Sequence, residues 1–114
     1  MIDIHTQQEN NYLVICVQGD ADASSAIHLD KVIRQAFDAK HKNIFIDCTE
    51  LNYISSAGLG VFMSYIEDIA ENQINFVIYG LSDKVLNVFN ILGLDQLLTI
   101  KKTKEEAISI LNGL

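Results

Sequence analysis

Apolar residues recur along this chain in two spacings, one typical of β-strands and the other of α-helices. Short, mostly apolar runs bounded by turn-forming residues predict strands at residues 2–6, 12–17, 43–48, 74–79 and 97–100. Residues 7–11 are polar and predict a turn between the first two strands. We expect the third strand to be central and the last one to lie at an edge of the sheet.

Apolar residues three or four positions apart predict helices between these strands. The first helix follows a turn at residues 19–22 and ends near residue 40, and the second runs from residue 56 to about residue 71. Ser82 and Gly93 bound the third, and a capping box of Thr103 and Glu106 opens the fourth. This alternation predicts an α/β fold, a mixed sheet of four to five strands covered by about four helices. Outside the second helix, the core-facing residues are then Leu29, Val32, Ile33, Ala36, Val85, Leu86, Phe89, Leu92, Ala107, Ile108 and Leu111.

The predicted second helix has two contrasting faces at about 100° per residue. One face is apolar and indicates a core contact, whereas the other begins with small residues and ends acidic. This outward face suits the docking of a partner, and an ordinary solvated face has the same pattern. The apolar face comprises Leu59, Phe62, Met63, Ile66 and Ile69, and the outward face comprises Ala57, Gly60, Ser64, Glu67, Asp68 and Glu71.

Composition narrows the classes of function. The 114 residues fit one domain, spanning residues 1–114, and a hydrophobic fraction of 49% is enough for a core of its own. A net charge of −7 argues against a nucleic-acid surface, and a solvated surface explains it better than a basic partner does. No apolar run has the length of a membrane span and no signal peptide is visible, so we expect a cytoplasmic protein.

The residues that most often carry chemistry are scattered. Cys16 and Cys48 each lie in an apolar strand-like run, which predicts small buried side chains in a reducing compartment. His5, His28 and His41 share no ligand spacing with the cysteines, so no metal site is expected. The chain also lacks the glycine-rich loop and lysine of a phosphate-binding loop. We therefore expect a protein without a cofactor and without enzymatic activity.

The most informative residues are Ser55 and Ser56, which follow a strand-like run and open the second helix. A helix start has unpaired N–H groups and the positive end of the helix dipole, so it favours a phosphate. Ala57, Gly58 and Gly60 leave the approach to the hydroxyls open. The same residues also fit a plain N-cap followed by glycines for close packing, and one serine can be a cap in one state and a phosphate carrier in the other.

Residues 46–60, with the sequence IDCTELNYISSAGLG, resemble the signature of STAS domains and, more narrowly, of bacterial anti-sigma factor antagonists. The resemblance continues at residues 19–22 (GDAD) and 90–98 (NILGLDQLL), and it covers essentially the whole chain in order. It implies that Ser56 stands at the position of the family's phosphorylated serine. Ser55 stands where Asp is common, and Ala57 stands where Ser or Thr is common. Ser55 is therefore a second candidate acceptor, unless the kinase has a different preference or the domain is no longer phosphorylated.

The resemblance implies a binding protein that is switched by phosphorylation. Unphosphorylated, the chain would bind an anti-sigma factor that is also a serine kinase, and it would thereby release a sigma factor for transcription. Phosphorylation of Ser56 would separate the complex, and a metal-dependent serine phosphatase would reset it. ATP and Mg²⁺ would belong to those partners. The partner-binding residues would be Asp22, Ser55, Ser56, Ala57, Gly58, Gly60 and Ser64.

Two carboxylates near these serines have alternative roles. Asp22 and Asp47 fall at or near loop ends beside the serine turn in the predicted fold, where they could act as acid and base or could hold loops by hydrogen bonds. We favour the structural role for Asp47. For Asp22 we favour the role that the resemblance implies, which is to orient the serine loop for the kinase.

Two other functions remain open. One is a STAS subunit of an ABC-type lipid transport system, in which the helix start would contact the ATPase. The other is a nucleotide hydrolase, which is disfavoured because neither a phosphate loop nor a metal site is visible.

Overall fold

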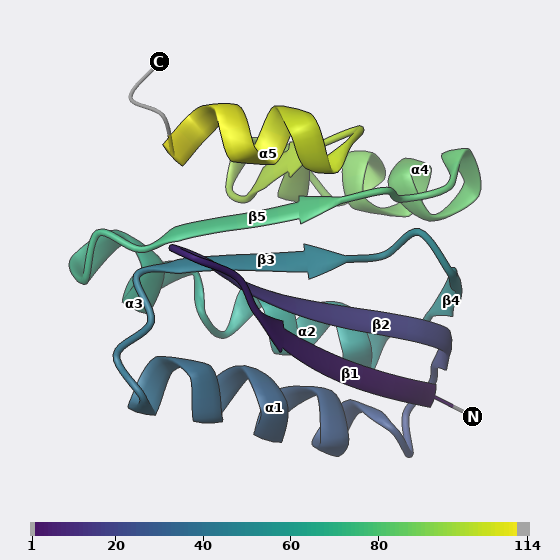
Figure 1. Ribbon diagram of the computed structural model, residues 1–114. Coiled ribbons are helices and arrows are strands. Elements are labelled where there is room, and N and C mark those ends of the chain that lie inside the picture. Colours follow the sequence, from purple (N-terminus) through teal and green to yellow (C-terminus); the bar gives the residue numbers. More distant parts are fainter. Residues whose placement is uncertain (1, 112–114) are drawn as a thin grey trace.

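The computed structural model describes residues 2–111, so residue 1 and residues 112–114 of the predicted domain lie outside the described part. Within it, six strands form one mixed sheet in the order β1-β2-β3-β5-β6, and β4 pairs with β2 (Figure 1). Of these strands, β1 alone is antiparallel to its neighbour. The strands are β1 Ile2–Gln8, β2 Leu13–Ala21, β3 Asn43–Asp47, β4 Leu51–Ile54, β5 Asn75–Tyr79 and β6 Thr99–Lys101.

Helices connect these strands and confirm the predicted α/β fold. The described residues contain one more strand and one more helix than expected, because β4 is a strand of its own and the predicted second helix is broken in two. The helices are α1 Ala26–Asp38, α2 Ser56–Met63, α3 Ile66–Glu71, α4 Asp83–Ile91 and α5 Lys104–Leu111, with a 3₁₀ turn, η1, at Leu94–Gln96.

The central strands are covered on both faces, because alternate residues point to opposite sides of the sheet. Ile15 of β2 and Ile46 of β3 belong to the larger core, which includes residues of α1, α2 and α4. Val14 and Phe45, one position earlier in each strand, belong to a smaller core that includes Ala107 of α5. Burial on both faces explains why these strands are continuous apolar runs in the sequence.

The predicted turn at residues 19–22 is wrong, because β2 continues through Ala21. Gly19 has a φ of +93° and pairs with Leu51 of β4, and the pairing register shifts between Gly19 and Asp20. Pairing with β4 thus extends β2 beyond the end of its pairing with β3. The turn begins only at Asp22, directly beside the start of α1.

The predicted helix over residues 56–71 is also wrong in its middle, where α2 ends and α3 begins. The Ser64 hydroxyl donates to the Val61 carbonyl at 2.6 Å. In a continuous helix that carbonyl would accept the N–H of Tyr65. The Tyr65 N–H instead donates to the Phe62 carbonyl at 3.2 Å, one residue closer, which tightens the turn. Helical spacing therefore fails at this point.

Two apolar residues that were predicted to face the core lie on the surface. Met63 is 48% exposed and Leu92 is 55% exposed. Met63 is the last residue of α2 and Leu92 is the residue after α4, so both stand where helical spacing ceases to determine direction. Val85 and Phe89 of α4 are buried as predicted.

The predicted helix boundaries at the C-terminal half are confirmed. The Ser82 hydroxyl accepts a backbone N–H from the first turn of α4 at 3.3 Å, and Gly93 ends that helix with a φ of +72°. Thr103 accepts the N–H of Glu106 at 3.2 Å, and the Glu106 carboxylate accepts the N–H of Lys102 at 2.8 Å. The capping box is therefore present, with its return bond one residue before the cap.

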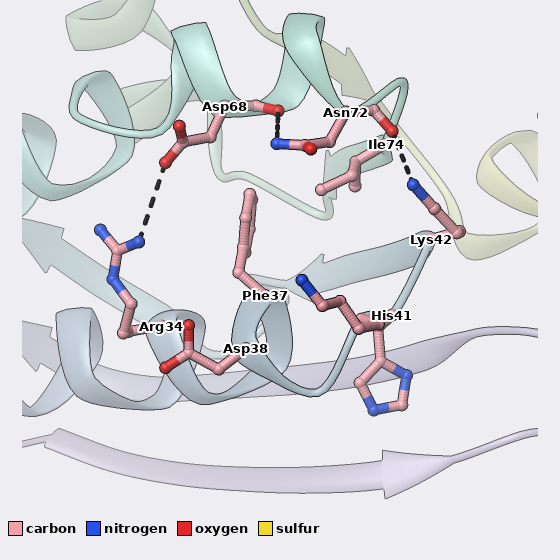
Figure 2. A pocket seen from close by; sticks show the side chains of 9 residues that line it. Arg34, Phe37, Asp38, His41, Lys42, Asp68, Asn72 and Ile74 are labelled. Atoms are coloured by element: carbon pink, nitrogen blue, oxygen red, sulfur yellow. Dashed lines mark hydrogen bonds and ion pairs between the residues drawn. The ribbon is translucent and has the colours of Figure 1, made fainter.

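Short α3 has no fully buried residue, but its Ile66 and Ile69 pack against the larger core. Polar contacts connect α3 and the residue after it to α1 and to the segment before β3, around a cavity of about 230 Å³ (Figure 2). Arg34 Nη1 lies 3.8 Å from Asp68 Oδ2, and Lys42 Nζ donates to the Asn72 carbonyl at 2.9 Å. Phe37 points into the space between these two contacts. Lys42 directly precedes β3, so the cavity lies at the amino-terminal end of this parallel strand, whereas Ser56 follows the carboxyl end of β4.

Candidate functional site

Ser55 is the N-cap of α2. Its backbone is extended, and its hydroxyl accepts the N–H of Gly58 at 3.2 Å. Its own N–H donates to the carbonyl of Ala21, the last residue of β2, at 2.8 Å. The half-buried Ser55 is thus the residue that joins strand, turn and helix, and its hydroxyl is engaged in capping.

Ser56 is the first residue of α2 and is exposed. Its hydroxyl makes no hydrogen bond to the described residues, and the backbone N–H groups of Ser56 and Ala57 find no acceptor among them either. The next two N–H groups are taken, because those of Gly58 and Leu59 donate to Ser55. A free hydroxyl thus lies beside two free N–H donors at the positive end of a helix.

Two glycines of this turn have opposite surroundings. Gly58 is buried, and a Cβ built on it would lie 2.8 Å from Ile54 Cγ1 and 3.2 Å from the carbonyl oxygen of Ala21. Gly60 is exposed, and a Cβ there would meet no atom within 4 Å. The fold requires a glycine at position 58, whereas nothing in the described residues requires one at position 60.

Ser56, Ala57, Gly60 and Ser64 are all exposed. Both Ser56 and Ala57 stand at helical spacing from Gly60, four and three residues before it, and Ser64 follows Gly60 by four. We call these four residues the outer face of α2. Gly58 does not belong to it, because it is buried against β2 and β4. The predicted site residues therefore divide into a surface group and a group that holds the turn in place.

Asp22 lies beside the serine turn through the pairing of β2 with β4. It follows Ala21, which pairs with Ile54 and accepts the N–H of Ser55. Its carboxylate, however, belongs to its own turn, where Oδ1 accepts the Ser24 hydroxyl at 2.8 Å and both the N–H and the hydroxyl of Ser25 at 3.0 Å. These bonds, first of all that of Ser24, lower the pKa of the Asp22 carboxyl below its ordinary value.

Asp47 has the structural role that the sequence favoured. It ends β3 and accepts the backbone N–H of Thr49 at 3.0 Å, and it also accepts the Thr49 hydroxyl. Thr49 in turn packs against Gly80, where a Cβ would lie 2.9 Å from the threonine hydroxyl. Asp47 thus fixes the loop between β3 and β4.

The sequence analysis did not identify the buried residues that contact the serine turn. Ala21 contributes a backbone carbonyl, which no side-chain pattern reveals, and Ile54 contributes the surface on which Gly58 packs. Tyr53, which is 47% exposed and lies just before the serines, was not singled out either. It lies on β4, which pairs with β2 and which the sequence pattern did not predict as a strand.

No cluster of three or more potential metal ligands occurs within residues 2–111. Both cysteines are free thiols, and burial raises the pKa of each above its ordinary value, which disfavours the reactive thiolate. In the same part of the chain, no helix is both long enough and apolar enough to cross a membrane.

Known proteins resemble this chain in sequence and in fold. A family model of the STAS domain matches residues 3–107. The anti-sigma-B factor antagonist of Listeria monocytogenes is 31% identical over 101 residues, which are 88% of this chain and 88% of that protein.

Two solved structures show the likeness in three dimensions. An anti-sigma factor antagonist from Mycobacterium paratuberculosis aligns with a TM-score of 0.89 and 18% identity, covering 98% of this chain and 95% of that one. The Bacillus cell fate determinant SpoIIAA, solved in its phosphorylated form, aligns with a TM-score of 0.73 and 20% identity, covering 96% and 99%. At such identities the likeness concerns the fold. The match over residues 3–107 shows that this chain belongs to the STAS domain family.

Proposed function

We propose that this protein is an anti-sigma factor antagonist that is switched by phosphorylation of Ser56. Unphosphorylated, it binds an anti-sigma factor with serine kinase activity and so releases a sigma factor for transcription. Phosphorylation ends this binding, and a serine phosphatase restores it. The support comes from the relatives described as anti-sigma factor antagonists and from the exposed serine at the start of α2. In this scheme ATP and Mg²⁺ are bound by the kinase.

The observation that carries the proposal is the difference between the two adjacent serines. The Ser55 hydroxyl is engaged as the cap of α2, whereas the Ser56 hydroxyl has no partner among the described residues. A phosphate on Ser56 would lie near the free N–H groups of Ser56 and Ala57 and near the positive end of the helix dipole. The domain therefore tolerates the modification without rearranging.

A phosphate on Ser56 should, in contrast, interfere with binding of the partner. A phosphoserine adds roughly −1.5 to −2 charge at neutral pH to a protein whose net charge is already −7. A surface that fits closely over the small residues of the outer face of α2 would meet a bulky dianion in place of a hydroxyl. Steric exclusion and like-charge contact can each change affinity by orders of magnitude.

Gly60 favours a close contact between the partner and the outer face of α2. A glycine inside a helix costs roughly 0.5–1 kcal/mol relative to alanine, and here the space above it is open. No contact among the described residues explains why position 60 lacks the methyl group of an alanine. The proposed function supplies a reason, because a partner can then approach the backbone of α2 itself.

Asp22 has an indirect role in this proposal. Its carboxylate holds the turn between β2 and α1, and that turn lies beside the serine loop. We assign to Asp22 the positioning of the kinase over Ser56, by the shape of the turn and by its partly exposed negative charge.

The direct test uses the serine-kinase anti-sigma factor encoded in the same genome. The purified chain is incubated with that kinase and ATP, and the phosphate is located by peptide mapping. We expect the phosphate on Ser56, no phosphate in Ser56→Ala, and persistent binding of that variant to the kinase. Ser55→Ala is the matched control and should still accept phosphate at Ser56. Phosphate found only on Ser55 or on a distant residue would overturn the proposal.

A further inference from the structure

A cleft of about 480 Å³ opens beside β6, the last strand of the sheet. Its walls come from the end of β6, the loop after β5, α4, η1 and the first turn of α5. Small-molecule pockets in proteins typically have volumes of about 300–1,000 Å³. The cleft is therefore large enough for a small organic ligand.

The topology of the sheet creates this cleft. β5 and β6 are neighbouring parallel strands, and the chain leaves their carboxyl ends toward opposite faces of the sheet. After β5 it enters α4, whose Val85 and Phe89 lie in the larger core, and after β6 it enters α5, whose Ala107 lies in the smaller core. A crevice remains between two such connections, and ligands of open α/β sheets bind in crevices of this kind.

Three of the residues that line the cleft are apolar. Leu81 follows β5, Leu86 belongs to α4 and Ile100 belongs to β6, and all three are only partly buried. Leu81 and Ile100 also pack against the larger core, so the fold sets their positions. An apolar ligand would remove the rest of their apolar surface from water, which favours binding.

The polar groups of the cleft that have no partner are mainly hydrogen-bond donors. Lys101 and Lys102 are exposed, and within residues 2–111 neither ammonium group forms an ion pair or a hydrogen bond. The side-chain amide of Asn90, on the α4 side, has no hydrogen-bond partner in that range either. A ligand that accepts hydrogen bonds would satisfy these groups.

The charge of the cleft differs from that of the whole chain. Its two lysines balance Asp95 and Glu106, so its side chains carry no net charge in a chain whose net charge is −7. Glu106 Oε1 already accepts the Lys102 N–H at 2.8 Å, as part of the cap of α5. The positive end of α5 also lies next to Lys102 and favours an anion. An anion is therefore repelled less here than the net charge of the chain suggests.

We propose that this cleft binds a small carboxylate with an apolar body. The apolar body covers Leu81, Leu86 and Ile100, and the carboxylate accepts hydrogen bonds from the ammonium groups of Lys101 and Lys102. A cationic ligand with the same apolar body would lose these bonds, and an uncharged one would lose their charge assistance.

The cleft is separate from the serine site. Along the sheet, β3 and β5 lie between β6 and β2, and β2 is the strand that pairs with β4. The ligand therefore occupies a different part of the domain from Ser56, and this proposal does not depend on the proposed function.

The test is a titration of the isotope-labelled chain with octanoate, followed by backbone NMR shifts. Octanol and octylammonium are the matched probes, because they attach an uncharged or a cationic head to the same apolar chain. The donor variant carries Lys101→Gln and Lys102→Gln. The control variant carries Lys31→Gln and Lys84→Gln, the same loss of charge at exposed positions outside the cleft. Thermal melting establishes that both variants keep the fold.

We expect octanoate to cause saturable shifts at the residues of the cleft. Two charge-assisted hydrogen bonds at an exposed rim should contribute roughly tenfold in affinity, so octylammonium should bind wild type, and octanoate the donor variant, about tenfold more weakly. Octanol should fall between the two other probes, and the control variant should bind octanoate like wild type.

Three results would overturn the proposal. One is the absence of saturable shifts in the cleft of the wild-type chain at millimolar octanoate. The others are octylammonium binding as tightly as octanoate, and a donor variant that binds octanoate like its control. If the donor variant does not fold, the comparison of the three probes on the wild-type chain decides by itself.

Discussion

At the scale of single residues, the serine turn separates what the fold needs from what a partner would need. Ser55 and Gly58 are committed to the fold, one as a cap and the other as a place where α2 meets β2 and β4 without a side chain. Ser56 and Gly60 carry no such commitment among the described residues. Substitutions can therefore affect stability and binding separately.

Alanine at the two glycines should have opposite effects on stability. Gly60→Ala should raise the free energy of unfolding by about 0.5–1 kcal/mol, because alanine favours the helix and its methyl group meets open space. It should also weaken binding to the anti-sigma factor. Gly58→Ala should lower the free energy of unfolding, because its Cβ would lie 2.8 Å from Ile54. Urea denaturation and partner affinity measured on both variants decide this, and a destabilised Gly60→Ala would contradict it.

Asp22→Asn should slow phosphorylation of Ser56 more than it lowers stability. All three hydrogen bonds to this side chain end on Oδ1, an atom that asparagine retains, so the turn should persist while the charge is lost. Positioning of reacting groups contributes strongly to rate. Kinase assays and thermal melts on the same sample provide the comparison, with Asp3→Asn on exposed β1 as control. An unchanged phosphorylation rate refutes the role assigned to Asp22.

At the scale of elements, the junction between α2 and α3 attaches the helix of the serine site to α1. Tyr65 is fully buried there, its hydroxyl donates to Asp30 Oδ1 at 2.6 Å, and its ring lies 4.9 Å from that of Phe37. The helix that begins at Ser56 is thus anchored to α1 at its other end.

Removal of the Tyr65 hydroxyl should destabilise the domain. Tyr65→Phe leaves the Asp30 carboxylate without this donor, which should lower the free energy of unfolding by about 1–3 kcal/mol. Tyr53→Phe, at an exposed tyrosine of β4, is the control and should change it little. Urea denaturation of the two variants tests the difference. Equal stabilities would show that the hydroxyl contributes nothing.

The same tyrosine should make stability depend on alkaline pH. Burial, then the hydrogen bond to Asp30, raises the pKa of Tyr65 above its ordinary value. The folded chain therefore keeps a proton that the unfolded chain loses above about pH 10, so the free energy of unfolding should fall as pH rises beyond that point. Denaturation between neutral pH and pH 11 should show a shallower fall in Tyr65→Phe. Identical slopes would count against this assignment.

At the scale of the whole molecule, the regular strands and helices were predicted from the sequence, whereas the places where they break or extend were not. The strands at Asn43–Asp47 and Asn75–Tyr79 followed from their apolar runs, and the ends of α4 followed from Ser82 and Gly93. The break before Tyr65 was not predictable from periodicity, because it lies in local hydrogen bonds, those of the Ser64 hydroxyl to Val61 and of the Tyr65 N–H to Phe62. The extension of β2 to Ala21 was missed because it depends on pairing with a strand 30 residues away.

The sequence named the residues of the candidate site, but it did not distinguish the ones that hold the turn from the ones that are exposed. Ser55 and Ser56 are adjacent in the sequence, and only the backbone geometry distinguishes the cap from the exposed hydroxyl. Likewise, Gly58 and Gly60 form one glycine pattern, and only the neighbouring Ile54 separates them. Distinctions of this kind arise from tertiary contacts, which a linear pattern does not contain.

Phosphorylation of Ser56 should leave the architecture unchanged while abolishing partner binding. The charge enters at the positive end of α2, so backbone NMR shifts should change near residues 20–25 and 53–64 only. Partner affinity measured on the same pair of samples should fall by orders of magnitude. Shift changes spread through residues 97–111, or an unchanged affinity, would contradict this mechanism.

The hydrogen bond from the Ser55 N–H to the Ala21 carbonyl has a consequence for how the serine can be recognised. The acceptor surface is assembled from two stretches of chain more than 30 residues apart, so it is a conformational epitope that a short peptide around Ser56 does not reproduce. A kinase that reads this surface distinguishes native molecules from nascent, truncated or misfolded ones. Under the proposed function, phosphorylation would then mark only copies in which β2 and β4 have paired.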